Sequence, residues 1–233
     1  MDFLARFAPL MAEALHLAAE VTLPLEDIRT QITAVAEAER RLPSPKAEGL
    51  PDPLGTQQQA LEDARFAAYA FVDEKLLNAQ RLDAADWLPF SLQVRYFKTT
   101  EAGTLFFERF NTHLAAAGIP KEDKGIALDL AERLDRLQAK SCPDVVRLFA
   151  LCLLYGFKGS LFRDAELLAR VRKSCQLLLK DAEGATIPFV QRRAAIRSVR
   201  DILESLSYVF VPIAVCAAFW LFCADIVSRI PLK

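Results

Sequence analysis

Few side chains in this sequence have the types and spacing that catalysis or metal binding requires. Glu13 and His16 have the Glu-x-x-His spacing that places two ligands on one helical face, as in di-iron helix bundles. Such sites need a second pair of this kind, whereas the only other histidine, His113, has no Glu three residues before it. The sequence also lacks a Ser-His-Asp, Cys-His or glycine-rich constellation. We therefore expect no catalytic residue, no metal site and no cofactor, and predict that the protein is not an enzyme.

Two adjacent carboxylates, Asp73 and Glu74, lie in a segment with helical periodicity. Asp73 falls on the apolar stripe of this helix, one turn before Leu77, and Glu74 falls at the edge of the stripe. A carboxylate on a packed face needs an Arg, Lys or backbone N–H partner, because its unpaired burial is strongly unfavourable. Two interpretations remain open, which are a structural bond to another helix and a carboxylate pair lining a cleft that receives a basic partner.

An aromatic segment follows a short polar turn at Gly103. The glycine permits two helices to meet closely, and Phe106, Phe107 and Phe110 come directly after it. Clustered aromatic side chains bury a large apolar area, so we expect these residues to pack in the core.

A second glycine pair ends a very apolar helical segment. Gly156 and Gly159 flank Phe157, and the run lacks the spacing and the following Ser or Thr of a phosphate-binding P-loop. The pattern therefore predicts a helix stop and a tight turn.

Apolar residues recur at helical spacing along most of the chain, and no stretch alternates with period two for long enough to form a sheet. Four prolines and Gly49 predict a mobile loop over 43–55. The fold class is therefore expected to be all-α. The first helix is predicted to end before Pro24, and the following helices to span 26–41, 56–78, 87–97, 104–117, 122–138, 144–155 and 164–180.

The stretch from Leu206 to Ala224 contains no charged residue and predicts a membrane anchor. About 20 apolar residues in a helix just cross the hydrocarbon core of a bilayer. Tyr208 and Trp220 lie near its two ends, as interfacial aromatic residues do, and Pro212 is tolerated near the start of such a span. Small alanines within it permit self-association of the anchor.

Basic residues around the span predict its orientation. Four arginines lie within about 15 residues before it, the window in which positive charge keeps a flank in the cytoplasm. They are Arg192, Arg193, Arg197 and Arg200, whereas only Arg229 and Lys233 follow. The expected organisation is a cytoplasmic helical domain (1–189), a juxtamembrane helix (190–205), the anchor (206–224) and a short periplasmic tail (225–233). With 29 basic and 30 acidic residues, the chain offers no electrostatic basis for binding nucleic acid.

Asp73-Glu74, Trp87, the run from Leu92 to Phe110 and the helix closing in Gly-Phe-Lys-Gly together resemble the DotU/TssL family of bacterial secretion-system membrane proteins. The resemblance covers roughly 60–178, and the C-terminal anchor supports it. It implies an all-helical cytoplasmic domain of two packed bundles in a hook shape, tethered to the bacterial inner membrane by a single pass.

The resemblance also implies a scaffold function. Such proteins bind a large IcmF/TssM-like membrane partner and, in type VI secretion systems, dock the baseplate. Asp73 and Glu74 then correspond to cleft residues, and the remaining motif residues to structural ones. Where the family commonly has acidic residues, this chain has Thr104 and Lys158, so a partner surface that uses those charges differs here.

Two alternatives remain. One is a DotU-type stabilising subunit of a type IVB secretion apparatus, which has no contractile tail. The other is a tail-anchored helical adaptor unrelated to secretion.

Overall fold

The computed structural model describes residues 2–43, 56–119, 126–137 and 142–180. Every regular element in these ranges is helical, which confirms the expected all-α class for the described part of the chain. All of these residues belong to one structural unit, Met1–Ala185. The predicted loop beyond Pro43, the juxtamembrane helix, the anchor from Leu206 to Ala224 and the tail lie outside the described residues.

The elements follow the predicted order closely. They are α1 (Phe3–Leu17), α2 (Leu25–Arg41), α3 (Thr56–Leu77), η1 (Ala84–Phe90), η2 (Gln93–Phe97), α4 (Ala102–Ala116), α5 (Ile126–Arg136), α6 (Asp144–Leu154), η4 (Gly159–Arg163) and α7 (Ala165–Lys180). Asp2 begins α1 by accepting a hydrogen bond from the amide of Ala5, at 2.9 Å, as N-cap residues do.

The single helix predicted over 87–97 is wrong, because two short helices of different kinds occupy this region. A 3₁₀ helix, η1, ends at Phe90, and a π-helix, η2, begins at Gln93. Pro89 has no backbone N–H to continue the ladder. Beyond it, the amides of Leu92 and Gln93 donate to the carboxylate of Asp73 instead of to carbonyls one turn earlier. The chain therefore changes direction between the two short helices.

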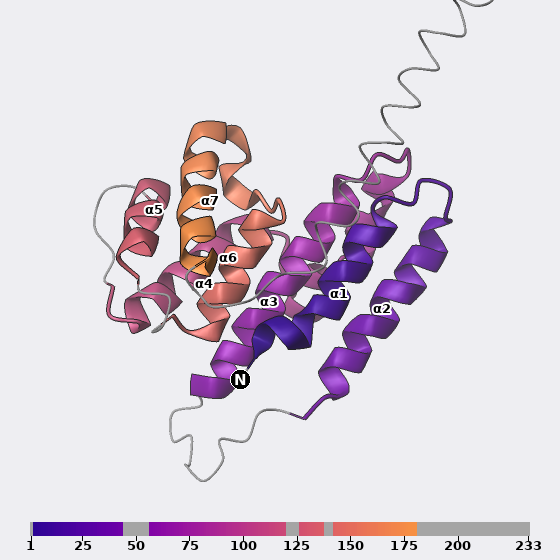
Figure 1. Ribbon diagram of the computed structural model, residues 1–233. Helices are drawn as coiled ribbons and strands as arrows, with labels where there is room; N and C mark the ends of the chain where they lie inside the picture. The colour runs from indigo at the N-terminus through magenta and orange to yellow at the C-terminus, as the bar shows by residue number, and fades with distance from the viewer. Residues whose placement is uncertain (1, 44–55, 120–125, 138–141, 181–233) are drawn as a thin grey trace, which may run out of the picture. The chain divides into compact units, whose positions relative to one another are not determined.

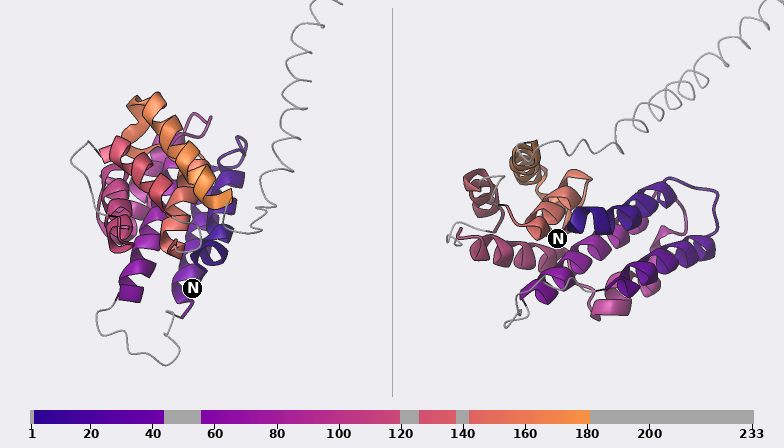
Figure 2. Two further views of the ribbon diagram at one scale, coloured as in Figure 1. Left: turned by 60° about the vertical axis from the view of Figure 1, so that its left-hand side comes forward. Right: turned by 60° about the horizontal axis from the view of Figure 1, so that its bottom comes forward.

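Helix α3 lies at the centre of the described unit. Its side chains from Asp63 to Asp73 are all buried, so neighbours cover every face of this part of the helix. Figures 1 and 2 show α2 on one side of α3 and α5 and α7 on the other, while α6 packs against both α3 and α1. Alanines at 64, 67, 68 and 70 allow the neighbouring helices to approach closely. The arrangement of two bundles in a hook stays a prediction.

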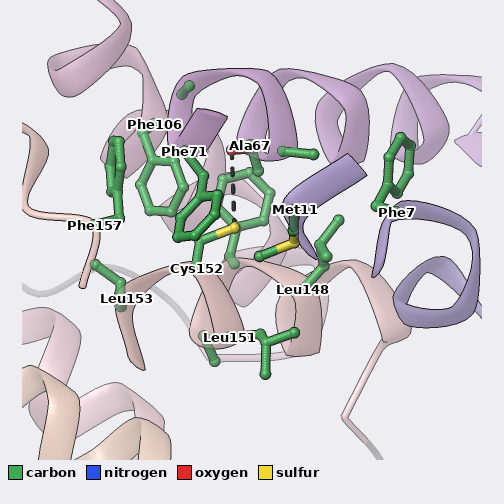
Figure 3. Packing of buried hydrophobic residues seen from close by; sticks show 14 of the residues in the cluster. Phe7, Met11, Ala67, Phe71, Phe106, Leu148, Leu151, Cys152, Leu153 and Phe157 are labelled. Atoms are coloured by element: carbon green, nitrogen blue, oxygen red, sulfur yellow. Dashed lines mark hydrogen bonds between the residues drawn. The ribbon is translucent and has the colours of Figure 1, made fainter. Parts of the chain in front are cut away.

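The core joins α1, α3 and α6 (Figure 3). Met11 of α1 lies beside Leu148 and Cys152 of α6, Phe7 of α1 lies beyond Leu148, and all four side chains are at most 3% exposed. The Cys152 thiol faces the carbonyl oxygen of Ala67 at 3.8 Å, so α6 and α3 pack tightly enough for a weak thiol hydrogen bond. Burial raises the pKa of the Cys152 thiol, which keeps it protonated and unreactive.

Among the described residues, the stretch Asp144–Arg163 is long and apolar enough to cross a membrane by length and composition alone. It contains α6, and 50% of its most apolar 18 residues is buried inside the protein. Core helices of folded domains have the same composition, and α6 packs against α3 as such a helix does.

A buried ionic cluster connects the first three helices. Glu39 of α2 is 5% exposed and accepts from Arg6 of α1 at 2.7 Å and from Arg65 of α3 at 2.9 Å. Arg6 also donates to the carbonyl oxygens of Glu39, Leu42 and Pro43 at the end of α2, where carbonyl groups lack the usual helical amide donors one turn later. One carboxylate therefore pairs with two guanidinium groups and fixes how three helices meet, and Glu62 supplies a second carboxylate to Arg65 at 2.6 Å.

We expect Glu39→Ala to lower the free energy of unfolding by about 3–5 kcal/mol, because it leaves buried cations without their shared carboxylate. Urea unfolding of the full chain measures the change. Glu37→Ala is the matched control, because Glu37 lies on the same helix in a partly exposed ion pair with Arg95 and should cost less than about 1 kcal/mol. Equal small losses for the two variants would contradict the role of Glu39.

Candidate functional site

Asp73 is a buried acceptor for three hydrogen bonds. Its Oδ1 accepts from the indole Nε1 of Trp87 and from the amide of Leu92, both at 2.9 Å, and its Oδ2 accepts from the amide of Gln93 at 2.8 Å. The residue is 4% exposed and Trp87 is fully buried. Asp73 therefore holds the end of η1 and the start of η2 against α3.

Burial raises the pKa of Asp73 to about 7, although the hydrogen bonds from Gln93, Trp87 and Leu92 act in the opposite direction. Desolvation penalises the ionised form, and the three donors stabilise it. Asp73 is consequently a carboxyl group whose charge changes near neutral pH.

Glu74, the next residue, accepts from a different part of the chain. Its two carboxylate oxygens accept from the amides of Lys158 and Gly159, each at 2.8 Å, where η4 begins. Burial raises the pKa of Glu74, although the two hydrogen bonds from Gly159 and Lys158 act in the opposite direction. Because consecutive residues on an α-helix point about 100° apart, one pair of carboxylates reaches two segments that are distant in the sequence.

Both interpretations of Asp73 and Glu74 from the sequence require partners for the two carboxylates. In the structure, the hydrogen-bond donors to both carboxylates belong to the chain itself. The donors are an indole and four backbone amides, not the Arg or Lys of another helix. Asp73 faces the interior, while Glu74 is partly exposed. Their proposed role in binding a partner stays a prediction.

Gly103 and Gly159 bring two backbone segments into direct contact. A Cβ atom on Gly103 would lie 3.1 Å from the Cα of Gly159, so the first turn of α4 packs directly on the start of η4. Gly159 has φ +50°, and a Cβ there would lie 2.9 Å from the carbonyl oxygen of Gly103. The predicted close approach at Gly103 is therefore present, and the other partner is a turn followed by a 3₁₀ helix. Gly156, with φ +96°, ends α6 in the left-handed conformation that glycine adopts readily.

The aromatic residues after Gly103 pack beneath this contact. Phe106 lies with its ring centroid 4.3 Å from that of Phe157 and 4.7 Å from that of Phe149. Phe107 and Phe110 are buried beside Phe106. The cluster joins α4 to α6 and to the turn that Glu74 holds.

A third buried carboxylate, Asp63, was not singled out from the sequence. It accepts from Gln59 of α3 at 3.0 Å, contacts Nε2 of His113 at 2.9 Å, and forms an ion pair with Arg109. Burial alone would raise the pKa of Asp63, but the bonds from His113 and Gln59 and the charge of Arg109 outweigh it, so the pKa is lowered. The signal in the sequence that could have indicated a shared partner is the spacing of Arg109 and His113, which lie four residues apart on one helical face.

The part of the chain that the structure describes contains no preformed metal-binding site. No group of three or more His, Cys, Asp or Glu side chains there is arranged to hold an ion. His16 belongs to α1, and its Nδ1 lies 3.7 Å from Oε1 of Glu20, which follows the helix. Both side chains are exposed.

Asp73→Asn tests the balance between burial and hydrogen bonding. Because the pKa of Asp73 is higher in the folded chain than in the unfolded chain, the folded chain holds the extra proton between about pH 4 and 7. The stability of the native sequence should therefore fall, relative to that of Asp73→Asn, as pH rises through this window, and the difference should level off above it. Urea unfolding at a series of pH values measures this.

The matched control is Asp86→Asn, because Asp86 lies on η1 and is exposed. Its difference from the native sequence should stay nearly constant over the same range. A constant difference for Asp73→Asn as well would show that the three hydrogen bonds keep the pKa of Asp73 near its ordinary value.

Gly159→Ala tests the backbone contact, with Gly118→Ala as the control. Both glycines have positive φ, but a Cβ at Gly118 meets nothing within 4 Å. Gly118→Ala should cost about 1 kcal/mol of unfolding free energy from backbone strain alone. Gly159→Ala should cost at least about 2 kcal/mol, because crowding adds to the strain. Similar values for the two would mean that the contact relaxes freely.

Comparison with known proteins identifies a family. Residues 3–118 match the model of the DotU family, described as type VI secretion system protein DotU. No curated protein and no solved structure gives a match to the chain.

The match differs in extent from the resemblance expected over 60–178. It begins in α1 and ends just after α4, so it adds the first two helices and leaves out the glycine turn after α6. Asp73, Glu74, Trp87, Gly103 and the phenylalanines of α4 all lie within it. On this match the chain belongs to the DotU family of bacterial secretion-system subunits.

Proposed function

We propose that this protein is a scaffold subunit of the inner-membrane complex of a bacterial type VI secretion system. In this role it binds an IcmF/TssM-like membrane partner and docks the baseplate. The observation that carries the proposal is the family match over residues 3–118, because the matched family is described by that system. Membership in this family makes the chain a secretion-associated subunit, and the named partners are our inference.

The internal bonding of the described unit supports a scaffold role. Asp73 and Glu74 accept hydrogen bonds from the chain's own segments at η1, η2 and the start of η4. Surface segments that are held in one conformation lose little entropy on binding a partner. In this proposal the two carboxylates serve partner binding by positioning these segments.

Membrane attachment is the second part of the proposal. The uncharged stretch from Leu206 to Ala224 would tether the helical domain to the inner membrane, with the arginines before it on the cytoplasmic side. Family membership points to the inner membrane as well. The single pass, the cytoplasmic location of the helical domain and self-association through the anchor belong to the proposal.

The second candidate is a stabilising subunit of a type IVB apparatus, and the same family match favours it over any function outside secretion. A tail-anchored adaptor unrelated to secretion is the remaining alternative. The three differ in which proteins lie next to the chain in the cell.

Crosslinking of a tagged full-length chain in cells, followed by detergent extraction and mass spectrometry, tests the proposal. We expect an IcmF/TssM-like protein together with baseplate or sheath proteins. Recovery of that large partner without any tail component would favour the type IVB role. Recovery of neither would overturn the secretion scaffold and leave the adaptor.

A further inference from the structure

Exposed large apolar side chains gather at one end of α1 and α2. Among the described residues, the exposed large hydrophobic side chains number seven, and four of them lie in two short segments, 20–24 and 81–90. Leu82 is completely exposed, Val21 is 60% exposed, Leu88 51% and Phe90 39%. We call these four residues the apolar end patch. Apolar groups that cluster on a surface mark interaction sites, whereas single ones need no explanation.

Hydrogen bonds from Arg81 join the two segments, and a buried hydrogen bond fixes the second segment to α3. Arg81, whose side chain is 6% exposed, donates to the carbonyl oxygens of Glu20 at 3.2 Å and Leu23 at 2.7 Å. Trp87, in the middle of the second segment, is fixed by Asp73 at 2.9 Å. In the second segment the side chains of Trp87 and Arg81 are buried. Their apolar neighbours in the sequence, Leu88 and Leu82, are exposed.

Phe90 is attached to the first turns of α2. The guanidinium of Arg29 lies 4.2 Å from the centre of the Phe90 ring, and the same side chain contacts Glu26 at 3.1 Å. The patch thus spans the α1–α2 connection, the start of α2 and η1.

Carboxylates surround the apolar end patch. Five exposed or partly exposed acidic residues lie in these two segments and in the adjoining first turn of α2, and they are Glu20, Glu26, Asp27, Asp83 and Asp86. The cations among them are Arg29, which is engaged with Glu26 and Phe90, and Arg81, which is nearly buried and paired with Asp83. The rim therefore carries a clear excess of negative charge.

We propose that the apolar end patch is a docking site for a segment of another protein whose apolar side chains are flanked by Lys or Arg. Opposite charges around an apolar centre favour such a partner and select against others. An anionic membrane surface would be repelled by the acidic rim. A second copy of this chain would bring two acidic rims together, which is unfavourable as well. The inference rests on the proposed function only in requiring that the chain acts by binding other proteins.

Site-specific photocrosslinking in the native cell tests this. The photoreactive amino acid p-benzoyl-phenylalanine replaces Leu82 in one full-length variant and Leu88 in another, and a third carries it at Ala115, an exposed position on α4. Mass spectrometry then identifies the attached peptide. We expect both patch positions to capture the same segment of another protein, with apolar residues flanked by Lys or Arg, and the Ala115 position not to capture it.

Charge reversal supplies the second readout. The double variant Asp27→Lys and Asp86→Lys should lower the crosslinking yield at Leu82 roughly fivefold or more, because two attractive pairs become repulsive. Glu108→Lys is the matched control, since Glu108 is exposed on α4 and away from the two patch segments, and should leave the yield unchanged. Circular dichroism checks that all variants keep their helicity.

Capture of lipid, of a second copy of this chain or of an acidic segment would overturn the proposed partner chemistry, as would a yield that charge reversal does not change. If the patch positions capture nothing while Ala115 captures a secretion-complex protein, this docking site is wrong and the scaffold function stands. If no position captures a secretion component and the patch captures an unrelated basic segment, the docking site stands and the secretion role is wrong.

Discussion

Two adjacent carboxylates at the C-terminal end of α3, Asp73 and Glu74, hold two separate segments of the chain against this helix. Asp73 accepts three hydrogen bonds from the η1–η2 junction, and Glu74 accepts two from the start of η4. The two side chains point about 100° apart on a helix whose residues from Asp63 to Asp73 are all buried. Two adjacent residues thereby join the parts of the chain that precede and follow α4.

Buried charge elsewhere in the described unit follows the same physical rule, because an ionised group leaves water only where partners replace its hydration. Glu39 has two arginines, and Asp63 has Arg109, His113 and Gln59. Each carboxylate contacts more than one element, so each restricts how helices pack. Apolar packing supplies the core, and these polar contacts specify the geometry in which it forms.

Much of the helical order could be predicted from the sequence, because apolar periodicity and prolines mark where long helices lie and end. The boundaries of α2 and α7 differ from prediction by a single residue. The region from Trp87 to Phe97 could not be predicted in this way, since its conformation depends on Asp73, a residue distant in the sequence. Periodicity placed Asp73 on a packed face but could not identify backbone amides as its donors. The contact of Gly103 with Gly159 and the partners of Asp63 likewise arise only from tertiary packing.

The hydrogen bonds of Asp73 and Glu74 position surface segments of the described unit. η1 presents Leu88 and Phe90 outward because Trp87 is held inside by Asp73, and η4 is placed against α4 because Glu74 holds its first amides. Amide hydrogen exchange of Asp73→Asn and Glu74→Gln, compared with the native chain, tests whether the two carboxylates anchor two separate segments. We expect faster exchange over 87–93 in the first variant and over 157–161 in the second, each with the other segment unchanged. Faster exchange across the whole domain in both variants, or in neither segment, would contradict this expectation.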